Sequence, residues 1–314
     1  MMLDILLVVL PVFLVVGFGF AAVRVGGFPS SSVDGLMGFA VRYGVPTLLF
    51  GKIARLDLGA AFDPRLLASF YVGACVCFIL GLVAARRRLG RRPGEAVVIG
   101  FSAMFSNTVL LGLPILTRAY GDAATGPAVM IIAVHAPFIY LVGITVMELS
   151  RRDGSGPLAT GRKIVTAIFS NALAIGIGAG FAVNLGGIAL PRFAYDAVDM
   201  MGAAALPAAL FGLGGALTRY RIRSDIREAA LIAGLTTLVH PLIVILLAGP
   251  VFGLPADFVR AAVVLAAMPT GMNGYVFAAQ YRRAEGAAAS GVLLGTAASV
   301  VTATVWLWFL NLLY

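Results

Sequence analysis

The segment Met104–Leu116, MFSNTVLLGLPIL, decides how the rest of the chain is interpreted. Among apolar residues it carries an amide, a hydroxyl, a glycine and a proline, at Asn107, Thr108, Gly112 and Pro114. Proline removes a backbone donor and clashes with the carbonyl four residues earlier, so this combination is unfavourable in an uninterrupted buried helix. The segment therefore predicts a helix that is interrupted at a functional site.

The composition places the chain in a lipid bilayer. The 314 residues are 61% hydrophobic and only 12% charged, with a mean hydropathy of +1.00, whereas a soluble domain has about 25% charged residues. A spanning helix needs about 20 mostly apolar residues, and β-barrel alternation is absent. The sequence therefore predicts an all-α polytopic membrane protein. Ten spans are predicted, at residues 5–22, 34–53, 66–85, 96–116, 125–147, 164–185, 194–217, 229–251, 258–281 and 287–312.

The net charge of +9 is arranged as a topology signal. Cytoplasmic loops carry an excess of Lys and Arg, and here the basic residues fall on alternate loops, 16 against 6. The richer side has Arg24, Arg86, Arg87, Arg88, Arg91, Arg92, Arg151, Arg152, Arg162, Lys163, Arg219, Arg221, Arg223, Arg227, Arg282 and Arg283. The poorer side has Lys52, Arg55, Arg65, Arg118, Arg192 and Arg260. Both termini are predicted on the outer side of the cytoplasmic (inner) membrane, and nucleic acid is not a predicted partner.

A short motif recurs at about half the chain length. PTLLFG begins at Pro46 and PAALFG at Pro207, 161 residues later. Five spans per half is an odd number, so the second half would enter the membrane with opposite polarity, as in the inverted repeats of secondary transporters. A six-residue match can also arise by chance, and the span count is the stronger observation. The predicted organisation is a first repeat at 1–149, a cytoplasmic linker at 150–163 and a second repeat at 164–314.

The fourth span of the second half is interrupted like the first. MPTGMNGY, residues 268–275, places Pro269, Thr270, Gly271 and Asn273 at mid-depth. Irregular backbone inside a membrane is tolerated where protein buries it or where it lines a watery cavity. Half-helix N-termini attract anionic groups, and the amides of Asn107 and Asn273 can donate to the same oxygens. Ordinary proline kinks are the alternative, but two interruptions in corresponding spans favour a substrate site.

Arg42 is the one basic residue deep inside a predicted span, about 12 Å from its inner end, whereas Lys52 and Arg260 lie within three residues of a span end. A charge at such depth usually faces a cavity or a partner. Arg42 is therefore a candidate countercharge for an anionic substrate. The alternative is that its long side chain extends along the helix to the inner surface.

His135 and His240 are the only histidines, and each lies beside a proline, at Pro137 and Pro241. Proline frees a carbonyl three or four residues upstream, and a neutral imidazole can satisfy such a group. The alternative role is proton coupling, because imidazole titrates near physiological pH. Without accompanying cysteines or carboxylates, neither histidine indicates a metal site, and no cofactor is predicted.

The distribution of acidic residues narrows the function. All fourteen Asp and Glu lie in loops or near span ends, although proton relays and cation sites in transporters typically use buried carboxylates. No GxxxxGK[ST] phosphate-binding loop occurs. A membrane enzyme would need a nucleophile–base pair or a carboxylate dyad, and no such group is visible at mid-depth. A secondary carrier is predicted over an enzyme or a receptor.

Four segments resemble the auxin efflux carrier family, whose bacterial branch includes malonate-transporter-like and malate-permease-like proteins. They are FSNTVLLGLPIL from Phe105, PAALFGLGGAL from Pro207, AAMPTGMNGYVFAAQY from Ala266 and VLLGTAASVV from Val292. The resemblance, which extends in fold to bile acid sodium symporters, implies ten helices, with a scaffold of spans 1, 2, 6 and 7 that often dimerises. It also implies a moving domain of spans 3–5 and 8–10, and an elevator-type mechanism for a small organic anion. An ion-coupled symporter, using Na⁺ or H⁺, is the alternative.

The resemblance also implies roles for particular residues. It places Asn107, Pro114, Pro269 and Asn273 at crossover and substrate-binding positions, with spans 4 and 9 crossing at their prolines. One departure concerns the sixth span, where the family commonly has Asn-Pro and this chain has Asn171 followed by Ala172. A specific role for that position is correspondingly weaker.

Overall fold

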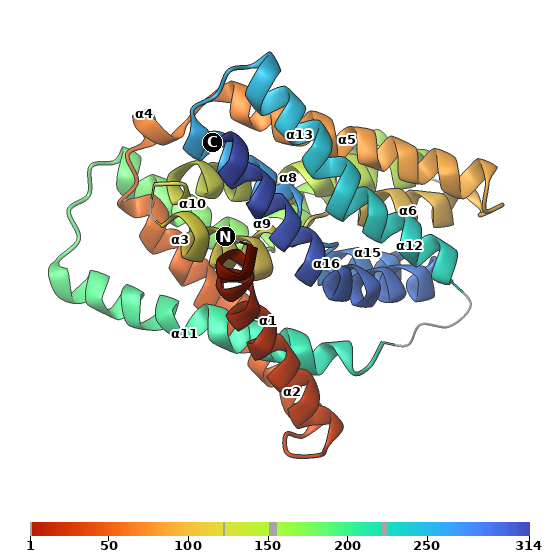
Figure 1. Cartoon of the computed structure of the whole chain (residues 1–314), viewed down its shortest axis with the longest axis horizontal. Coiled ribbons are helices and arrows are strands. Elements are labelled where there is room, and N and C mark those ends of the chain that lie inside the picture. Colours follow the sequence, from red (N-terminus) through yellow and green to blue (C-terminus); the bar gives the residue numbers. More distant parts are fainter. Residues whose placement is uncertain (1, 122, 151–155, 221–224) are drawn as a thin grey trace. The chain divides into compact units, whose positions relative to one another are not determined.

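The computed structural model describes residues 2–121, 123–150, 156–220 and 225–314, and within them the chain is helical (Figure 1). The only β-type pairing among these residues is an isolated bridge between Ser106 and Thr270. The predicted all-α fold is confirmed. The helices are α1 (Met2–Arg24), α2 (Ser30–Phe39), α3 (Val45–Ala54), α4 (Leu58–Ala61), α5 (Pro64–Arg87), α6 (Pro93–Met104), α7 (Leu113–Tyr120), α8 (Thr125–Ser150), α9 (Pro157–Phe169), α10 (Ala172–Leu185), α11 (Arg192–Leu217), α12 (Ile226–Gly234), α13 (His240–Leu246), α14 (Ala256–Ala266), α15 (Met272–Tyr281) and α16 (Glu285–Leu313).

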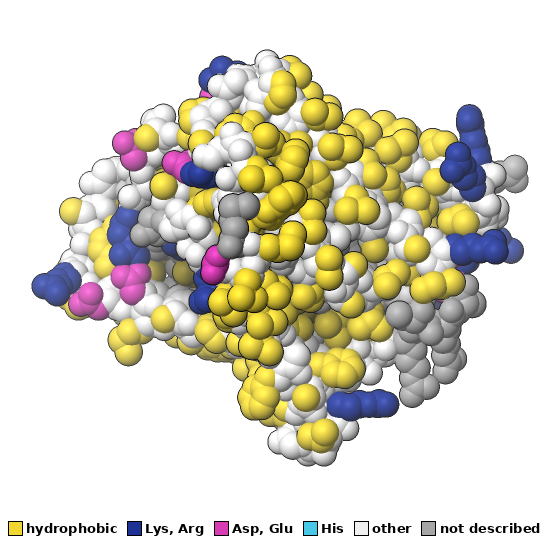
Figure 2. All heavy atoms as spheres, in the orientation of Figure 1, with side chains coloured by type: hydrophobic (Ala, Val, Ile, Leu, Met, Phe, Trp, Pro, Cys, Tyr) yellow, Lys and Arg dark blue, Asp and Glu magenta, His cyan; other side chains and the backbone are white. Residues whose placement is uncertain are grey.

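Six helical runs in the described residues are long and apolar enough to cross a membrane, or seven if the bent pair α9–α10 is one span. Large hydrophobic side chains lie exposed on them, such as Leu242 of α13 and Val301 of α16. Figure 2 shows hydrophobic side chains covering the face over these two helices, with Lys and Arg gathered at its margin. Such a surface is suited to lipid. Two shorter apolar helices, Pro93–Met104 and Thr108–Tyr120, share the fourth predicted span.

Short π-helical turns precede three of the prolines that lie within predicted spans. The turns η1 (Ala40–Gly44), η2 (Thr108–Gly112) and η3 (Leu235–Val239) each end two residues before a proline. Those prolines are Pro46, Pro114 and Pro241. Proline cannot donate to the carbonyl four residues earlier and its ring crowds that carbonyl, and a wider π turn relieves the crowding. A fourth turn, η4 (Leu247–Val251), contains Pro250 itself.

The sixth predicted span is bent rather than straight. Helices α9 and α10 meet at an angle of 71°, and Asn171 caps α10 by accepting a hydrogen bond from Leu173 N at 2.9 Å. A break therefore forms here without the proline that the resemblance leads one to expect, because an asparagine cap suffices. The helix α9 also begins at Pro157, inside the predicted linker 150–163. Residues 151–155 of that linker lie outside the described residues, as do the predicted topology residues Arg221 and Arg223.

The chain divides into two compact units. Unit 1 comprises Met1–Leu10, Asp63–Ile164 and Tyr220–Tyr314, and unit 2 comprises Pro11–Phe62 and Val165–Arg219. Each unit therefore combines segments from both halves of the sequence. Within unit 2, helix α3 packs against α10 and α11. Within unit 1, α5 packs against α6 and α13, and α6 also contacts α8 and α15.

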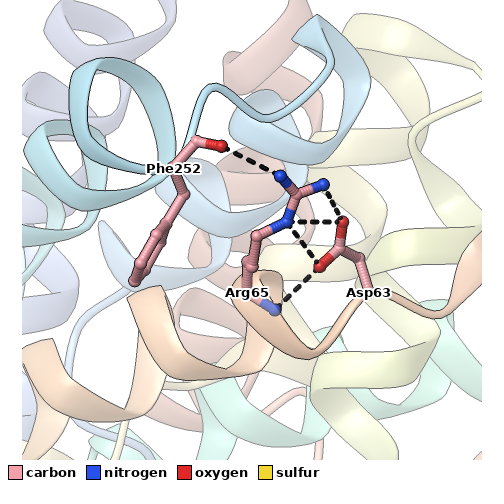
Figure 3. A network of polar contacts seen from close by, with 3 residues as sticks. All are labelled: Asp63, Arg65 and Phe252. Carbon is pink, nitrogen blue, oxygen red and sulfur yellow. Dashed lines mark hydrogen bonds and ion pairs between the residues drawn. The ribbon is translucent and has the colours of Figure 1, made fainter.

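Charged side chains fix the ends of helices in unit 1. Asp63 caps α5 by accepting from Arg65 N at 2.8 Å, and the Arg65 guanidinium holds the same carboxylate and Phe252 O (Figure 3). The neighbouring guanidinium lowers the pKa of the Asp63 carboxyl below its ordinary value. At another end, Arg91 forms ion pairs with Asp225 and Glu228. These contacts stabilise helix ends, where the unpaired backbone groups of a helix lie.

Candidate functional site at a helix crossing

Two extended segments meet inside unit 1. One connects α6 to η2 and the other connects α14 to α15. They pair antiparallel: Asn107 N donates to Pro269 O at 2.8 Å and Gly271 N donates to Phe105 O at 3.1 Å. Backbone groups inside a bilayer have no water to bond to, so this pairing satisfies the groups that both helix breaks release. The crossing joins the two interrupted segments that the sequence singled out.

Each segment leads directly into the N-terminus of a helical piece. Asn107 is the N-cap of η2, and its Oδ1 accepts from Leu110 N at 3.3 Å. Gly271 is the N-cap of α15, without a side-chain cap. The unpaired N–H groups of the first turn give such ends a partial positive charge. Two helix N-termini therefore begin at the crossing.

The structure brings together most of the candidate residues of the two broken spans. Asn107, Thr108, Pro269, Thr270 and Gly271 all lie at the crossing and are buried. A Cβ built on Gly271 would lie 3.6 Å from Asn107 Cβ, so the two segments are in direct contact there. These five residues form one cluster, here called the crossing cluster.

Three other candidates lie outside the crossing cluster. Asn273 is half-buried in the first turn of α15. Gly112 donates its N–H to Asn107 O at 3.1 Å and packs against Leu265. Pro114 is buried in α7, beyond η2. The bridge residues are Ser106 and Thr270, so the crossing includes Pro269 but not Pro114, which differs from the expectation that both prolines cross.

Arg42 lies in unit 2, exposed in the π turn η1. Unit 2 holds none of the other candidate residues. Arg42 and the crossing cluster therefore belong to different units.

Both histidines bond to Ser106, a residue of the crossing that is not among the candidate residues. His135 Nε2 lies 3.1 Å from Ser106 O, and His240 Nδ1 lies 3.2 Å from Ser106 Oγ. His240 Nε2 also lies 3.1 Å from Phe70 O. The two carbonyls that the histidines contact, those of Ser106 and Phe70, therefore belong to other segments of the chain. They are not the carbonyls upstream of Pro137 and Pro241 that the sequence led us to expect. Ser106 lies within the MFSNTVLLGLPIL segment, but nothing in that pattern separates it from its neighbours.

Two buried hydroxyls near the crossing have no hydrogen-bond partner among the described residues, Ser102 Oγ and Thr270 Oγ1. A Cβ built on Gly274 would lie 3.0 Å from each of them. Glycine at this position leaves space beside both hydroxyls in the first turn of α15. The crossing therefore contains polar groups that are not used for internal bonding.

Buried acids occur in the described residues, but at helix ends. Glu148 near the end of α8 pairs with Lys163 at 2.9 Å, and Glu228 in the first turn of α12 pairs with Arg91 at 2.8 Å. The crossing cluster itself contains one side-chain amide, two hydroxyls and backbone groups, and no carboxylate. Its charge is that of the helix N-termini, which is positive in character.

A helical chain with membrane-length apolar helices and a buried crossing of two interrupted spans has the features of a multi-pass membrane transporter. The comparison with known protein families gives the same class: residues 4–307 match the model for the family described as "Membrane transport protein". The chain belongs to this family, and the resemblance to auxin efflux carriers is confirmed.

Two relatives cover nearly the whole chain. One is the "Putative malonate transporter" of Rhizobium meliloti (strain 1021), 25% identical over 314 residues that cover 99% of this chain and 97% of the relative. The other is an "Uncharacterized transporter" of Methanothermobacter thermautotrophicus, 24% identical over 307 residues that cover 95% and 96% of the two chains. The family and its members are transporters rather than enzymes, as the sequence predicts.

Proposed function

We propose that this protein is a secondary carrier that moves a small organic anion, a carboxylate, across the cytoplasmic membrane. The observation that carries the proposal is the crossing cluster, where two helix N-termini begin and no carboxylate is present. A negatively charged group is stabilised at such ends by the free N–H groups. The printed name of the Rhizobium relative, "Putative malonate transporter", supports a small carboxylate of this kind.

The binding site that we propose uses the first turns after each break. The Oδ1 of Asn107 caps η2, which directs its amide NH₂ away from the helix that it caps. Asn273 lies in the first turn of α15 and is half-buried, so its amide can reach a bound molecule. Thr108, Gly112, Pro114, Pro269, Thr270 and Gly271 would shape the site. Arg42 is retained in the proposal as a countercharge for the anion, because it carries a positive charge inside a predicted span.

The architecture that we propose is ten spans in two inverted five-span repeats. Contacts within unit 2 support it. At an offset of 161 residues, Gly51 corresponds to Gly212 and Met37 corresponds to Val198. A Cβ built on Gly51 would lie 2.6 Å from Val198, and one built on Gly212 would lie 2.6 Å from Met37. When each residue is replaced by its counterpart in the other repeat, the contact of Gly51 with Val198 becomes the contact of Gly212 with Met37. A pseudo-two-fold axis between the repeats would produce this exchange.

The crossing in unit 1 is compatible with an inverted repeat. At an offset of 164 residues, Asn107 corresponds to Gly271 and Phe105 corresponds to Pro269. The hydrogen bond from Asn107 N to Pro269 O then corresponds to the bond from Gly271 N to Phe105 O. An antiparallel bridge always relates its two bonds in this way, so the main support for the repeat comes from the contacts within unit 2.

The two compact units suggest how the carrier moves. Unit 1 contains spans 3–5 and 8–10 of the proposed numbering, and most of unit 2 comes from spans 1, 2, 6 and 7. We propose that unit 1 carries the substrate as a moving body and that unit 2 is the scaffold, in an elevator-type alternating-access mechanism. The scaffold would also form the interface of a homodimer.

An ion-coupled symporter is the second candidate function. Its support would come from His135 and His240, which lie against the crossing and could accept protons. For Na⁺ the crossing cluster offers hydroxyl and carbonyl oxygens but no carboxylate, and cation sites in transporters typically include a buried acid. The uncoupled carrier therefore fits the crossing better.

Transport by the purified protein tests the function. Reconstituted into liposomes, the carrier should exchange internal for external malonate. Added malate or an indole-acetate-type acid should reduce this counterflow to the extent that it binds the same site. Neutral amides of the same acids should not compete, since they lack the charge that the helix N-termini favour. Counterflow of a neutral or cationic solute in preference to carboxylates would contradict the proposal.

The loop charges predict the orientation of the chain. Reporter fusions after Arg88 and after Arg219 are expected to report the cytoplasm, because both positions lie on the basic side. A fusion after Arg118 is expected to report the outer side. The reverse pattern at all three positions would overturn the assignment of both termini to the outside.

A further inference from the structure

The surroundings of the two histidines carry an inference that rests on the proposed function and deepens it. His135 belongs to α8 and His240 is the first residue of α13. Both imidazoles are buried, and both bond to Ser106 at the crossing. Each also packs edge-on against the ring of Phe70, with centroids 5.6 Å and 4.8 Å away. Two helices therefore hold one residue through its carbonyl and its hydroxyl.

The hydrogen bonds determine which ring nitrogens carry protons. The partners of His135 Nε2 and His240 Nε2 are the carbonyls of Ser106 and Phe70. A carbonyl oxygen can only accept, so both Nε2 atoms must carry hydrogen. In neutral His240 the lone pair on Nδ1 then accepts from the Ser106 hydroxyl. The same assignment leaves His135 Nδ1 as a bare lone pair, without a partner among the described residues.

The environment disfavours a second proton on either ring. The aromatic neighbours of His135 are Phe70, Tyr71 and Phe105, and Tyr71 uses its hydroxyl to donate to Ile131 O at 2.7 Å. Among the described residues, no Asp or Glu forms an ion pair or hydrogen bond with either histidine. A buried imidazolium without a counterion carries a large desolvation penalty. A charge on one ring would also repel a charge on the other.

We propose that His135 and His240 are positioning residues, neutral Nε2–H imidazoles that fix Ser106 and thereby the adjacent Asn107 in the substrate site. Asn107 follows Ser106 directly, and its N–H is the donor of the crossing bond to Pro269 O. The orientation of the Asn107 amide is therefore set by the backbone that the two histidines hold. This assigns to His240, His135 and Ser106 a role in substrate affinity rather than in proton movement.

Spectroscopy on the full-length protein tests the protonation state without any substrate. The chain has only two histidines, so ¹⁵N-histidine labelling of protein purified with a histidine-free tag gives four ring nitrogens. From about pH 5.5 to about pH 8, the range in which histidine ordinarily titrates, each ring should show one protonated and one bare nitrogen. The variants H135Q and H240Q assign the two rings. A ring that becomes doubly protonated with a midpoint in this range would overturn the proposal.

Transport by paired variants tests the positioning role. Glutamine at 240 can donate to Phe70 O and accept from Ser106 but cannot carry a proton, whereas leucine can do neither. H240Q is expected to stay within about threefold of the wild type. H240L is expected to raise the KM about fivefold, as the loss of the one hydrogen bond to Ser106 implies, because the bond to Phe70 O does not reach the crossing. The pH profile should be the same in all three. A pH-dependent uptake that H240Q abolishes would show that the histidine moves a proton.

Coupling between Ser106 and His240 supplies the control. S106A removes only the hydroxyl, so it should raise the KM as H240L does. The double variant should raise the KM no more than either single one, because both substitutions remove the Ser106–His240 bond. Additive effects would show that the two residues do not act through each other. If the wild type transported no carboxylate at all, the proposed function would fail, while the nitrogen spectra would still decide the tautomers.

Discussion

Replacing Asn107 with aspartate is expected to reduce carboxylate transport about 100-fold or more while leaving the protein folded, since hydrogen bonds to charged groups contribute about 1.5–3 kcal/mol. The side-chain oxygen of Asn107 caps η2 through Leu110 N, and aspartate caps a helix as well as asparagine does. The variant therefore keeps the structural role. It loses the NH₂ donor and adds a negative charge where the substrate carboxylate would bind.

The same substitution at Asn273 is expected to have the same effect. Asn273 lies in the first turn of α15, where an acidic side chain is favourable to the helix. N273D should then be at least as stable as the wild type and inactive. Melting temperature in detergent and counterflow in liposomes measure the two properties separately.

Asn171 provides a matched control for both variants. It caps α10 in unit 2 through Leu173 N, whereas the crossing cluster belongs to unit 1. N171D should leave both folding and transport near wild-type values. Substantial carboxylate transport by N107D or N273D would show that these amides do not bind the substrate. Loss of folding in N107D would show that the amide NH₂ is structural.

The places where the helices break were predictable because proline, glycine and asparagine have direct consequences for backbone hydrogen bonding. The two interrupted spans, with Asn107 in one and Pro269 in the other, lie together in the structure. Their exact point of contact was not predictable, since proline can be accommodated by a π turn as well as by a break. Before Pro114 the chain forms the π turn η2, and the break lies earlier, at Ser106.

Long-range contacts are the part that sequence patterns do not contain. The histidines were recognised as unusual, but their partner Ser106 lies 29 and 134 residues away in sequence. A serine in an apolar segment gives no periodicity or motif that distinguishes it from a packing residue. The bend at Asn171 was missed for a related reason: the expected signal was a proline, and a cap produced the break instead.

Sodium-independent, potential-sensitive anion movement is the second large expected effect. The crossing cluster has no carboxylate, and strong cation sites in transporters typically need one. If both histidines stay neutral, no group at the crossing brings a compensating proton. Each turnover would then move the charge of the anion across the membrane.

The size of the effect follows from the electrical work. Moving one elementary charge through 100 mV corresponds to about 2.3 kcal/mol, which is about a 50-fold ratio of concentrations. An inside-negative potential would therefore drive net export of the anion. In proteoliposomes with the potential clamped by valinomycin and potassium gradients, reversing the sign of the potential should reverse the direction of net malonate movement. Replacing Na⁺ by choline should change neither rate nor direction.

The alternative mechanisms give different results in the same experiment. A sodium symporter would require a Na⁺ gradient whatever the potential, and such strict dependence without a response to voltage would refute the uncoupled carrier. A proton symporter would respond to an imposed pH gradient at zero potential, and H240Q or H135Q would remove that response. The uncoupled carrier is expected to show neither, because its site attracts the anion through helix N-termini and amides, groups whose charge does not change with pH. For such a site the membrane potential and the substrate gradient are the only driving forces.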